Sequence, residues 1–140
     1  LLSTVSEPPQ RPPSMLDNST GYFLPTEDVS RIRDCYWPVP AQVTHPDAGP
    51  LHATDLSCLP PALIAYAEFD PIRDDGDAYA TRLREAGVSV SHACIPGYAH
   101  GFLSWFAIPS IKQVCDEMLG RFQLLLGLEP ASVVPVEVSA

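Results

Sequence analysis

The sequence predicts an α/β fold in which two parallel strands are joined through a helix. An apolar run at residues 61–69 and an alternating run at 88–95 have the patterns of β-strands, and a helical pattern at 73–87 lies between them. A strand, a helix and a second strand in this order form a right-handed βαβ unit, whose strands lie side by side. A longer helical pattern follows at 109–127.

The two strands differ in their expected burial. PALIAYAEF (61–69) is nearly continuous in apolar residues and is flanked by Pro60 and Asp70, which is typical of a strand buried on both faces. VSVSHACI (88–95) alternates, which predicts a half-exposed strand at the edge of the sheet. Because parallel strands are stable in covered sheets of several strands, we expect sequence upstream of Leu1 to supply the missing neighbours.

Three helices are predicted. In the first, at 24–37, Thr26 is the expected cap; in the second, at 73–87, Asp74 or Asp75 is the cap and Gly87 ends the helix. The third has Pro109 in its first turn. The inward faces that we expect are Val29, Ile32, Cys35 and Tyr36 in the first helix, Tyr79, Leu83 and Ala86 in the second, and Ile111, Val114, Cys115, Met118, Leu119, Phe122, Leu125 and Leu126 in the third.

The remaining segments are predicted to be irregular. Residues 1–5 have the pattern of a strand end, and SEPPQRPPS (6–14) is a proline-stiffened loop. The proline-rich stretch at 38–60 is predicted to be a long ordered connection. Residues 96–108 are predicted to form a loop, and residues 128–140 a mobile tail. The domain is therefore expected to span 1–127, with 1–60 leading into a strand, helix, strand, helix unit at 61–127.

Composition and charge restrict the classes of partner. The chain has 8 Lys and Arg against 17 Asp and Glu, a net charge of −9, and no basic patch, which argues against nucleic acid and anionic membranes as partners. No apolar run approaches the ~18 residues of a membrane span. Four cysteines, Cys35, Cys58, Cys94 and Cys115, include no closely spaced pair. We expect unpaired, mostly buried thiols and a cytoplasmic location.

Asp70 and His100 are the residues best placed for chemistry. Each comes shortly after a predicted strand, and the ends of adjacent parallel strands lie about 4.8 Å apart on one rim of a sheet. An aspartate that accepts a hydrogen bond from an imidazole fixes its tautomer and stabilises the imidazolium. The pair is therefore predicted to act as general base and then general acid for a nucleophile such as serine. From these residues alone, an ordinary loop histidine remains the alternative.

Other chemistry finds less support in the sequence. No serine lies in G-x-S-x-G, and no H-G-G-G run supplies oxyanion donors. His92 falls on the apolar side of a strand, where a structural role is expected. A zinc site from His92, Cys94 and His100 lacks a fourth ligand, and a calcium loop beginning at Asp70 lacks its closing glutamate. We therefore predict neither a metal site nor another cofactor.

Three motifs follow one another between residues 50 and 102, namely DLSxLPPAL, AEFDPxRDxGxxYAxxLxxAGV and HGF. In this order and spacing they resemble the C-terminal portion of the hormone-sensitive-lipase-like branch of the α/β-hydrolases, which includes many bacterial carboxylesterases. Residues 12–37 look like the segment after the sixth sheet strand of that branch, so the resemblance covers about 10–125. It implies the C-terminal part of an α/β-hydrolase fold, incomplete as a domain, with 61–69 and 88–95 as the seventh and eighth strands.

The resemblance implies a serine carboxylesterase for esters with short to medium acyl chains. Asp70 matches the acid and His100 the base of its Ser-His-Asp triad, whereas the oxyanion and nucleophile motifs would lie upstream, so this chain alone is expected to be inactive. Candidates to line the substrate pocket are Phe102, Leu103, Trp105 and Phe106, for which plain packing is an equal alternative. The resemblance also implies a homodimer through the edge strand at 88–95.

Two alternatives of other classes stay open. One is a non-catalytic ligand-binding protein on the same fold, like the gibberellin receptors, in which the triad histidine is replaced; the intact His100 argues against it. The other is an inactive remnant or interaction module. A serine in an upstream elbow turn would favour the hydrolase, and cooperative unfolding of the isolated chain would favour a self-sufficient module.

Overall fold

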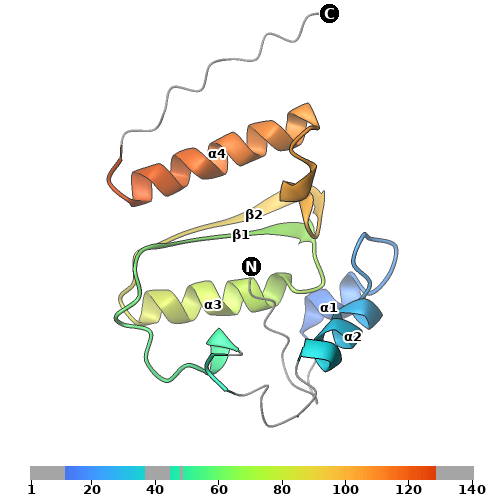
Figure 1. Ribbon diagram of the computed structural model, residues 1–140, viewed down its shortest axis with the longest axis horizontal. Helices are drawn as coiled ribbons and strands as arrows, with labels where there is room; N and C mark the ends of the chain where they lie inside the picture. The colour runs from blue at the N-terminus through green and yellow to red at the C-terminus, as the bar shows by residue number, and fades with distance from the viewer. Residues whose placement is uncertain (1–11, 37–44, 48, 129–140) are drawn as a thin grey trace, which may run out of the picture.

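The described part of the chain is a two-stranded parallel sheet between two helices. The computed structural model describes residues 12–36, 45–47 and 49–128. Strand β1 (Ala62–Phe69) pairs in parallel with β2 (Val90–Ala99), and helix α3 (Arg73–Glu85) connects them. As Figure 1 shows, α3 covers one face of the sheet and α4 (Pro109–Leu125) covers the other. The predicted α/β architecture with its parallel strand pair is therefore confirmed.

Each face of the sheet has its own apolar core. The cluster on the α4 side consists of Ala67, Ile95, Phe102, Ile111 and Met118. The cluster on the α3 side consists of Leu56, Leu83 and Val88. Val90 packs against the second cluster and Ala93 against the first, which confirms the predicted alternation in this strand. Most residues of β2 are partly or fully exposed and only Ile95 is buried, which agrees with the predicted half-exposed strand, although a helix lies over each face of the sheet.

Two short helices, α1 (Pro13–Asp17) and α2 (Thr26–Tyr36), lie beside the end of β1 that leads to Asp70 (Figure 1). The sequence predicts α2 but not α1, since the prolines of 6–14 indicated a loop. Pro13 instead occupies the first helical turn, where its fixed φ angle suits a helix and its missing N–H costs nothing. The strand end predicted at 1–5 lies outside the described residues.

The predicted helix caps are wrong in both helices concerned. Thr26 donates its hydroxyl hydrogen to the carbonyl oxygen of Met15 at 2.7 Å, so it joins α2 to α1. Helix α3 begins without a side-chain cap. Asp74 accepts a hydrogen bond from the Ser14 N–H at 2.8 Å, and Asp75 is buried. The sequence could not show these partners, because they lie on another helix.

The end of β2 also differs from the prediction. The strand begins at Val90 and continues to Ala99, beyond the expected 88–95. The predicted loop at 96–108 contains a 3-10 turn, η3 (Phe102–Trp105). The extra length of β2 matters for the site, because it carries the chain to His100.

Helices α2 and α4 bury less of their apolar faces than the sequence predicts. In α2, Val29 is buried, whereas Ile32 and Tyr36 are exposed. In α4, Ile111 and Met118 are buried, and the exposed members of its predicted face are Leu119, Phe122 and Leu126. Periodicity identifies the apolar face of a helix without identifying what covers it. None of the helices in the described ranges is long and apolar enough to cross a membrane.

The described part of the proline-rich connection, residues 45–47 and 49–60, contains one regular element. This is η2 (Pro50–His52), a single 3-10 turn that the sequence does not predict. Arg82 of α3 anchors the connection by donating hydrogen bonds to the carbonyl oxygens of Leu51 and Ala53. Residues 37–44 and 48 of the connection, and 129–140 of the predicted tail, lie outside the described residues.

All four cysteines are unpaired, as predicted. Their predicted burial is wrong, because Cys35, Cys58 and Cys94 are exposed and Cys115 is only partly buried. An apolar strand or helix pattern does not require each small residue in it to face a core.

Candidate active site

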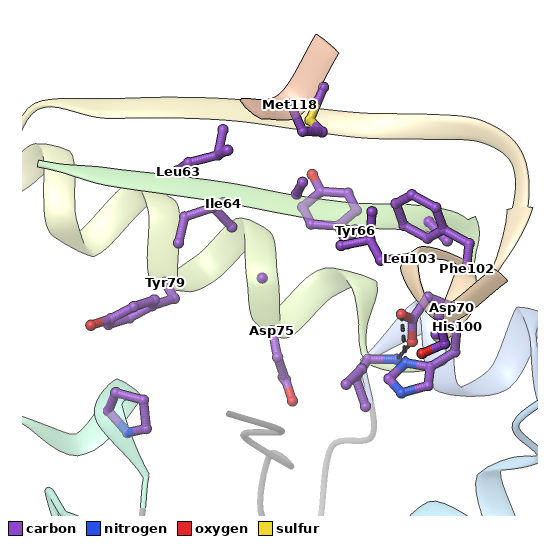
Figure 2. Close-up of a pocket in the computed structure, with 17 residues that line it drawn as sticks. Leu63, Ile64, Tyr66, Asp70, Asp75, Tyr79, His100, Phe102, Leu103 and Met118 are labelled. Atoms are coloured by element: carbon purple, nitrogen blue, oxygen red, sulfur yellow. Dashed lines mark hydrogen bonds and ion pairs between the residues drawn. The ribbon is translucent and has the colours of Figure 1, made fainter. Parts of the chain in front are cut away.

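Asp70 and His100 meet at one end of the sheet. Asp70 follows the last residue of β1, and His100 follows the last residue of β2. His100 Nδ1 lies 2.8 Å from Asp70 Oδ2, a contact drawn as a dashed line in Figure 2. The structure therefore brings together the two residues that the strand ends predicted.

The carboxylate of this pair is buried, and the imidazole is partly exposed. The Asp70 side chain is 7% exposed and that of His100 is 25% exposed. A buried carboxylate requires hydrogen bonds, and the second oxygen of Asp70, Oδ1, accepts one from the Ile72 N–H at 2.9 Å. A carboxylate at Nδ1 favours the tautomer with its proton on that nitrogen. His100 Nε2 is then the nitrogen that can accept a proton.

Helix α1 holds the turn that carries Asp70. Ser14, which is fully buried, donates its hydroxyl hydrogen to the Pro71 carbonyl at 2.8 Å and accepts the Asp74 N–H at 3.2 Å. Asn18 donates to the Asp70 carbonyl at 3.2 Å. Sequence reasoning missed Ser14 and Asn18, because their partners lie 52 to 60 residues further along the chain.

The four residues that were predicted to line a substrate pocket do not all lie at the same place in the structure. Phe102 and Leu103 line a pocket of about 460 Å³ together with Asp70 and His100. Trp105 and Phe106 are not among its described lining residues. Phe106 is 67% exposed, so the structure supports a pocket position for only two of the four.

Two aromatic residues between α1 and α2 pack at the border of the site. Tyr22 stacks on Phe69 with ring centroids 4.6 Å apart and an interplanar angle of 5°. Phe23 meets Trp105 edge to face at 5.0 Å. The sequence does not single out Tyr22 or Phe23, because they lie in a segment without a regular apolar period.

The pocket extends along β1. Its lining includes the five consecutive strand residues Leu63, Ile64, Ala65, Tyr66 and Ala67, with Tyr79 of α3 (Figure 2). Successive side chains of a strand point to opposite faces, so consecutive lining residues indicate a pocket that follows the strand edge. Since β2 pairs with the other edge, this is the edge at which the sequence predicts a further strand.

His92 belongs to a second polar cluster. Tyr66 donates a hydrogen bond to Asp77 at 2.5 Å, and His92 Nε2 lies 2.8 Å from the Tyr66 hydroxyl and 2.9 Å from Asp77 Oδ1. Burial raises the pKa of Tyr66, and the hydrogen bond to Asp77 raises that pKa further. The phenol therefore stays protonated as a donor. The structural role predicted for His92 is confirmed, in a cluster that joins β1, β2 and α3.

Comparison with known proteins shows what the chain is similar to. Residues 1–104 match a family model described as alpha/beta hydrolase fold. The chain is 36% identical over 119 residues to the ethyl acetate hydrolase of Pseudomonas putida, which covers 85% of this chain and 36% of that protein. It is 53% identical over 73 residues to the carboxylesterase NlhH of Mycobacterium tuberculosis, which covers 51% of this chain and 23% of that protein.

Solved structures agree with these matches. The structure of a thermostable esterase from Pseudomonas putida superimposes with a TM-score of 0.77 at 31% identity, covering 89% of this chain and 41% of that one. The chain thus spans 36% of the ethyl acetate hydrolase and 41% of the esterase whose structure it matches.

Proposed function

This chain belongs to the α/β-hydrolase fold family, and we propose that it provides the acid and the base of a serine carboxylic-ester hydrolase for esters with short to medium acyl chains. One observation carries the proposal, namely the 2.8 Å contact between His100 Nδ1 and Asp70 Oδ2 beyond the ends of two parallel strands. Similarity to an ethyl acetate hydrolase and to a carboxylesterase supports the choice of ester substrates.

In the proposed reaction, every proton passes through His100 Nε2. This nitrogen takes the hydroxyl proton of a serine as the serine oxygen attacks the ester carbonyl, and then gives the proton to the departing alcohol. Water repeats the sequence on the acyl-enzyme and releases the carboxylic acid. Asp70 keeps the imidazole oriented through Nδ1 and stabilises its charged form. Phe102 and Leu103 provide apolar surface next to the pair.

We place the nucleophile and the oxyanion hole outside this chain. None of its serines lies in a G-x-S-x-G turn, and the buried hydroxyl of Ser14 is engaged with Pro71 and Asp74. The pocket along the edge of β1 supports a partner that adds a strand there, namely the upstream half of the same hydrolase domain. The chain alone is then inactive.

The proposal also includes the cellular compartment and the oligomeric state of the protein. Unpaired cysteines support a reducing, cytoplasmic compartment. In the described residues β2 pairs only with β1, which supports a homodimer formed through the outer edge of β2.

The test uses this chain expressed together with the upstream half of the hydrolase domain, in one polypeptide or as two, which we call the complemented protein. Hydrolysis of p-nitrophenyl acetate and butyrate is measured. His100→Ala is expected to abolish hydrolysis, because loss of a triad member costs orders of magnitude in rate.

Two variants serve as matched controls. His52→Ala changes an exposed histidine in η2, and Ser104→Ala removes a hydroxyl that lines the pocket; both are expected to keep wild-type activity. Undiminished hydrolysis by His100→Ala would overturn the assigned base. Loss of activity in Ser104→Ala would overturn the placement of the nucleophile outside the chain.

A further inference from the structure

Strand β2 contains a bulge shortly before His100. From Ala62 to Ala67, β1 pairs in one unbroken register with residues 90–95 of β2. The next pair is Phe69 with Ala99, so β1 takes two steps from Ala67 while β2 takes four steps from Ile95. Glu68 is the residue of β1 at which the register changes.

The bulge decides which side chain lies opposite Asp70. If the register that pairs Ala67 with Ile95 continued unchanged, Tyr98 would lie opposite Asp70. After the bulge, the register that pairs Phe69 with Ala99 sets His100 opposite Asp70, where the 2.8 Å contact forms. Bulges near active sites commonly re-aim a side chain in this way.

Glu68 replaces the ladder bonds that the bulge interrupts. Its carboxylate oxygen Oε2 accepts the N–H of Gly97, in the bulge, at 2.8 Å. Its backbone carbonyl accepts a hydrogen bond from Arg73 Nη1 at 3.0 Å. Both contacts supply partners for backbone groups that lie outside the regular pairing.

Gly97 gives the bulge its shape. Its φ of +78° lies in the left-handed region, which glycine adopts without steric cost. A Cβ at this position would meet nothing within 4 Å. The backbone conformation, rather than lack of space, therefore favours glycine here, and the Gly97 N–H is aimed at the Glu68 carboxylate.

We infer that Glu68 is a positioning residue, whose carboxylate holds the bulge of β2 and thereby sets His100 against Asp70. Its effect on catalysis rests on the proposed function, whereas its effect on the orientation of His100 rests on the geometry of the strands. Glu68 acts through the Gly97 N–H and takes no part in the chemical step.

Three substitutions separate the hydrogen bond from the charge and the bulk of the side chain. Glu68→Ala removes the acceptor. Glu68→Met removes it while keeping the length of the side chain, and Glu68→Gln keeps an amide oxygen that can accept the Gly97 N–H. Glu85→Ala is the matched control, since it removes an exposed carboxylate at the end of α3.

The first measurement is steady-state hydrolysis by the complemented protein. E68A and E68M are expected to lower kcat by roughly 10- to 100-fold, the loss expected for a catalytic group misplaced by about 1 Å. KM is expected to stay unchanged, because a base that acts in the transition state adds little to substrate binding. E68Q is expected to keep most of the wild-type kcat, and E85A all of it. Wild-type kcat in E68A and E68M, or equal losses in E68A and E68Q, would overturn the inference.

The second measurement does not depend on activity. In an imidazole proton–nitrogen NMR spectrum of the complemented protein, the His100 signal, assigned by its loss in His100→Ala, reports a proton on Nδ1 bound to Asp70. E68A and E68M are expected to lose this hydrogen-bonded signal, and E68Q to retain it. An unchanged signal in E68A and E68M would overturn the inference. If the wild type does not hydrolyse esters, the proposed function fails, and this spectrum still decides the role of Glu68.

Discussion

Asp70 gives its two side-chain oxygens different tasks. Oδ1 accepts the Ile72 N–H and so shapes the turn into α3. Oδ2 accepts the hydrogen bond from His100. Because the carboxylate is buried and both oxygens are engaged, its orientation is set by the fold before any substrate arrives. One residue thus links the local turn to the proposed chemistry.

Cys94 offers a test of local electrostatics on β2. Cys94 is exposed as a residue, but the protein atoms around its thiol displace part of the surrounding water, and this desolvation raises the pKa of Cys94. Arg73 opposes this effect, and Glu68 and Asp77 add to it. Since the thiolate is the form that reacts, alkylation by iodoacetamide is expected to reach its half-maximal rate at a higher pH than alkylation of free cysteine.

The measurement follows alkylation by mass spectrometry over a range of pH, in a complemented protein whose other cysteines in this chain, Cys35, Cys58 and Cys115, are replaced by serine. N-acetylcysteine is the matched reference thiol. A rate curve for Cys94 centred at or below that of the reference would contradict the expectation.

Helix α3 approaches β1 closely at Gly76. A Cβ at this position would lie 2.7 Å from a ring carbon of Tyr66. The ring is restrained, because its hydroxyl is hydrogen-bonded to Asp77 and His92. The helix reaches this distance from the sheet because residue 76 has no side chain.

Gly76→Ala is therefore expected to destabilise the protein although alanine favours helix. Overpacking costs about 1 to 3 kcal/mol, against a gain of about 1 kcal/mol in helix propensity, for a net loss of up to about 2 kcal/mol. Gly120→Ala in α4 is the matched control, since its Cβ would meet nothing within 4 Å. It is expected to stabilise by up to about 1 kcal/mol.

The free energy of unfolding of the complemented protein in urea measures both changes. Equal stabilisation by the two substitutions would contradict the close approach at Gly76. Restored stability when Gly76→Ala is combined with Tyr66→Leu would identify the ring as the obstacle.

Taken together, the described chain leaves much apolar surface exposed. On α4 the exposed residues are Leu119, Phe122 and Leu124, and near the Asp70 end of the sheet they include Leu16, Phe23 and Phe106. The pocket adds the edge of β1 to this surface. A sheet of two parallel strands normally lies within a larger covered sheet, so the stability of this chain is expected to depend on a partner.

Unfolding of the isolated chain tests this dependence. In urea, the isolated chain is expected to aggregate or to lose its circular dichroism signal without a cooperative transition, whereas the complemented protein unfolds cooperatively. A cooperative transition in the isolated chain would contradict this expectation and favour a self-sufficient module. The same experiment thus separates the hydrolase proposal from the interaction-module alternative.

Local patterns in the sequence predicted the order of β1, α3, β2 and α4, the span of β1, and the rim of the sheet on which Asp70 and His100 lie. The continuous apolar run at 61–69 and the alternation at 88–95 are properties of neighbouring residues, and each strand end places the next polar residue on the rim of the sheet. Helix α1 escaped prediction because its prolines also suit a loop.

Contacts between distant segments decided the rest. The bulge held by Glu68 and Gly97, the support of Asp70 by Ser14 and Asn18, and the cluster around Tyr66 all join residues far apart in the chain. Periodicity predicted that β2 would lead toward His100, but without the bulge its register would set Tyr98 opposite Asp70. A register change depends on the partner strand as well as on the strand itself, and hydrophobic patterning along one strand does not encode it.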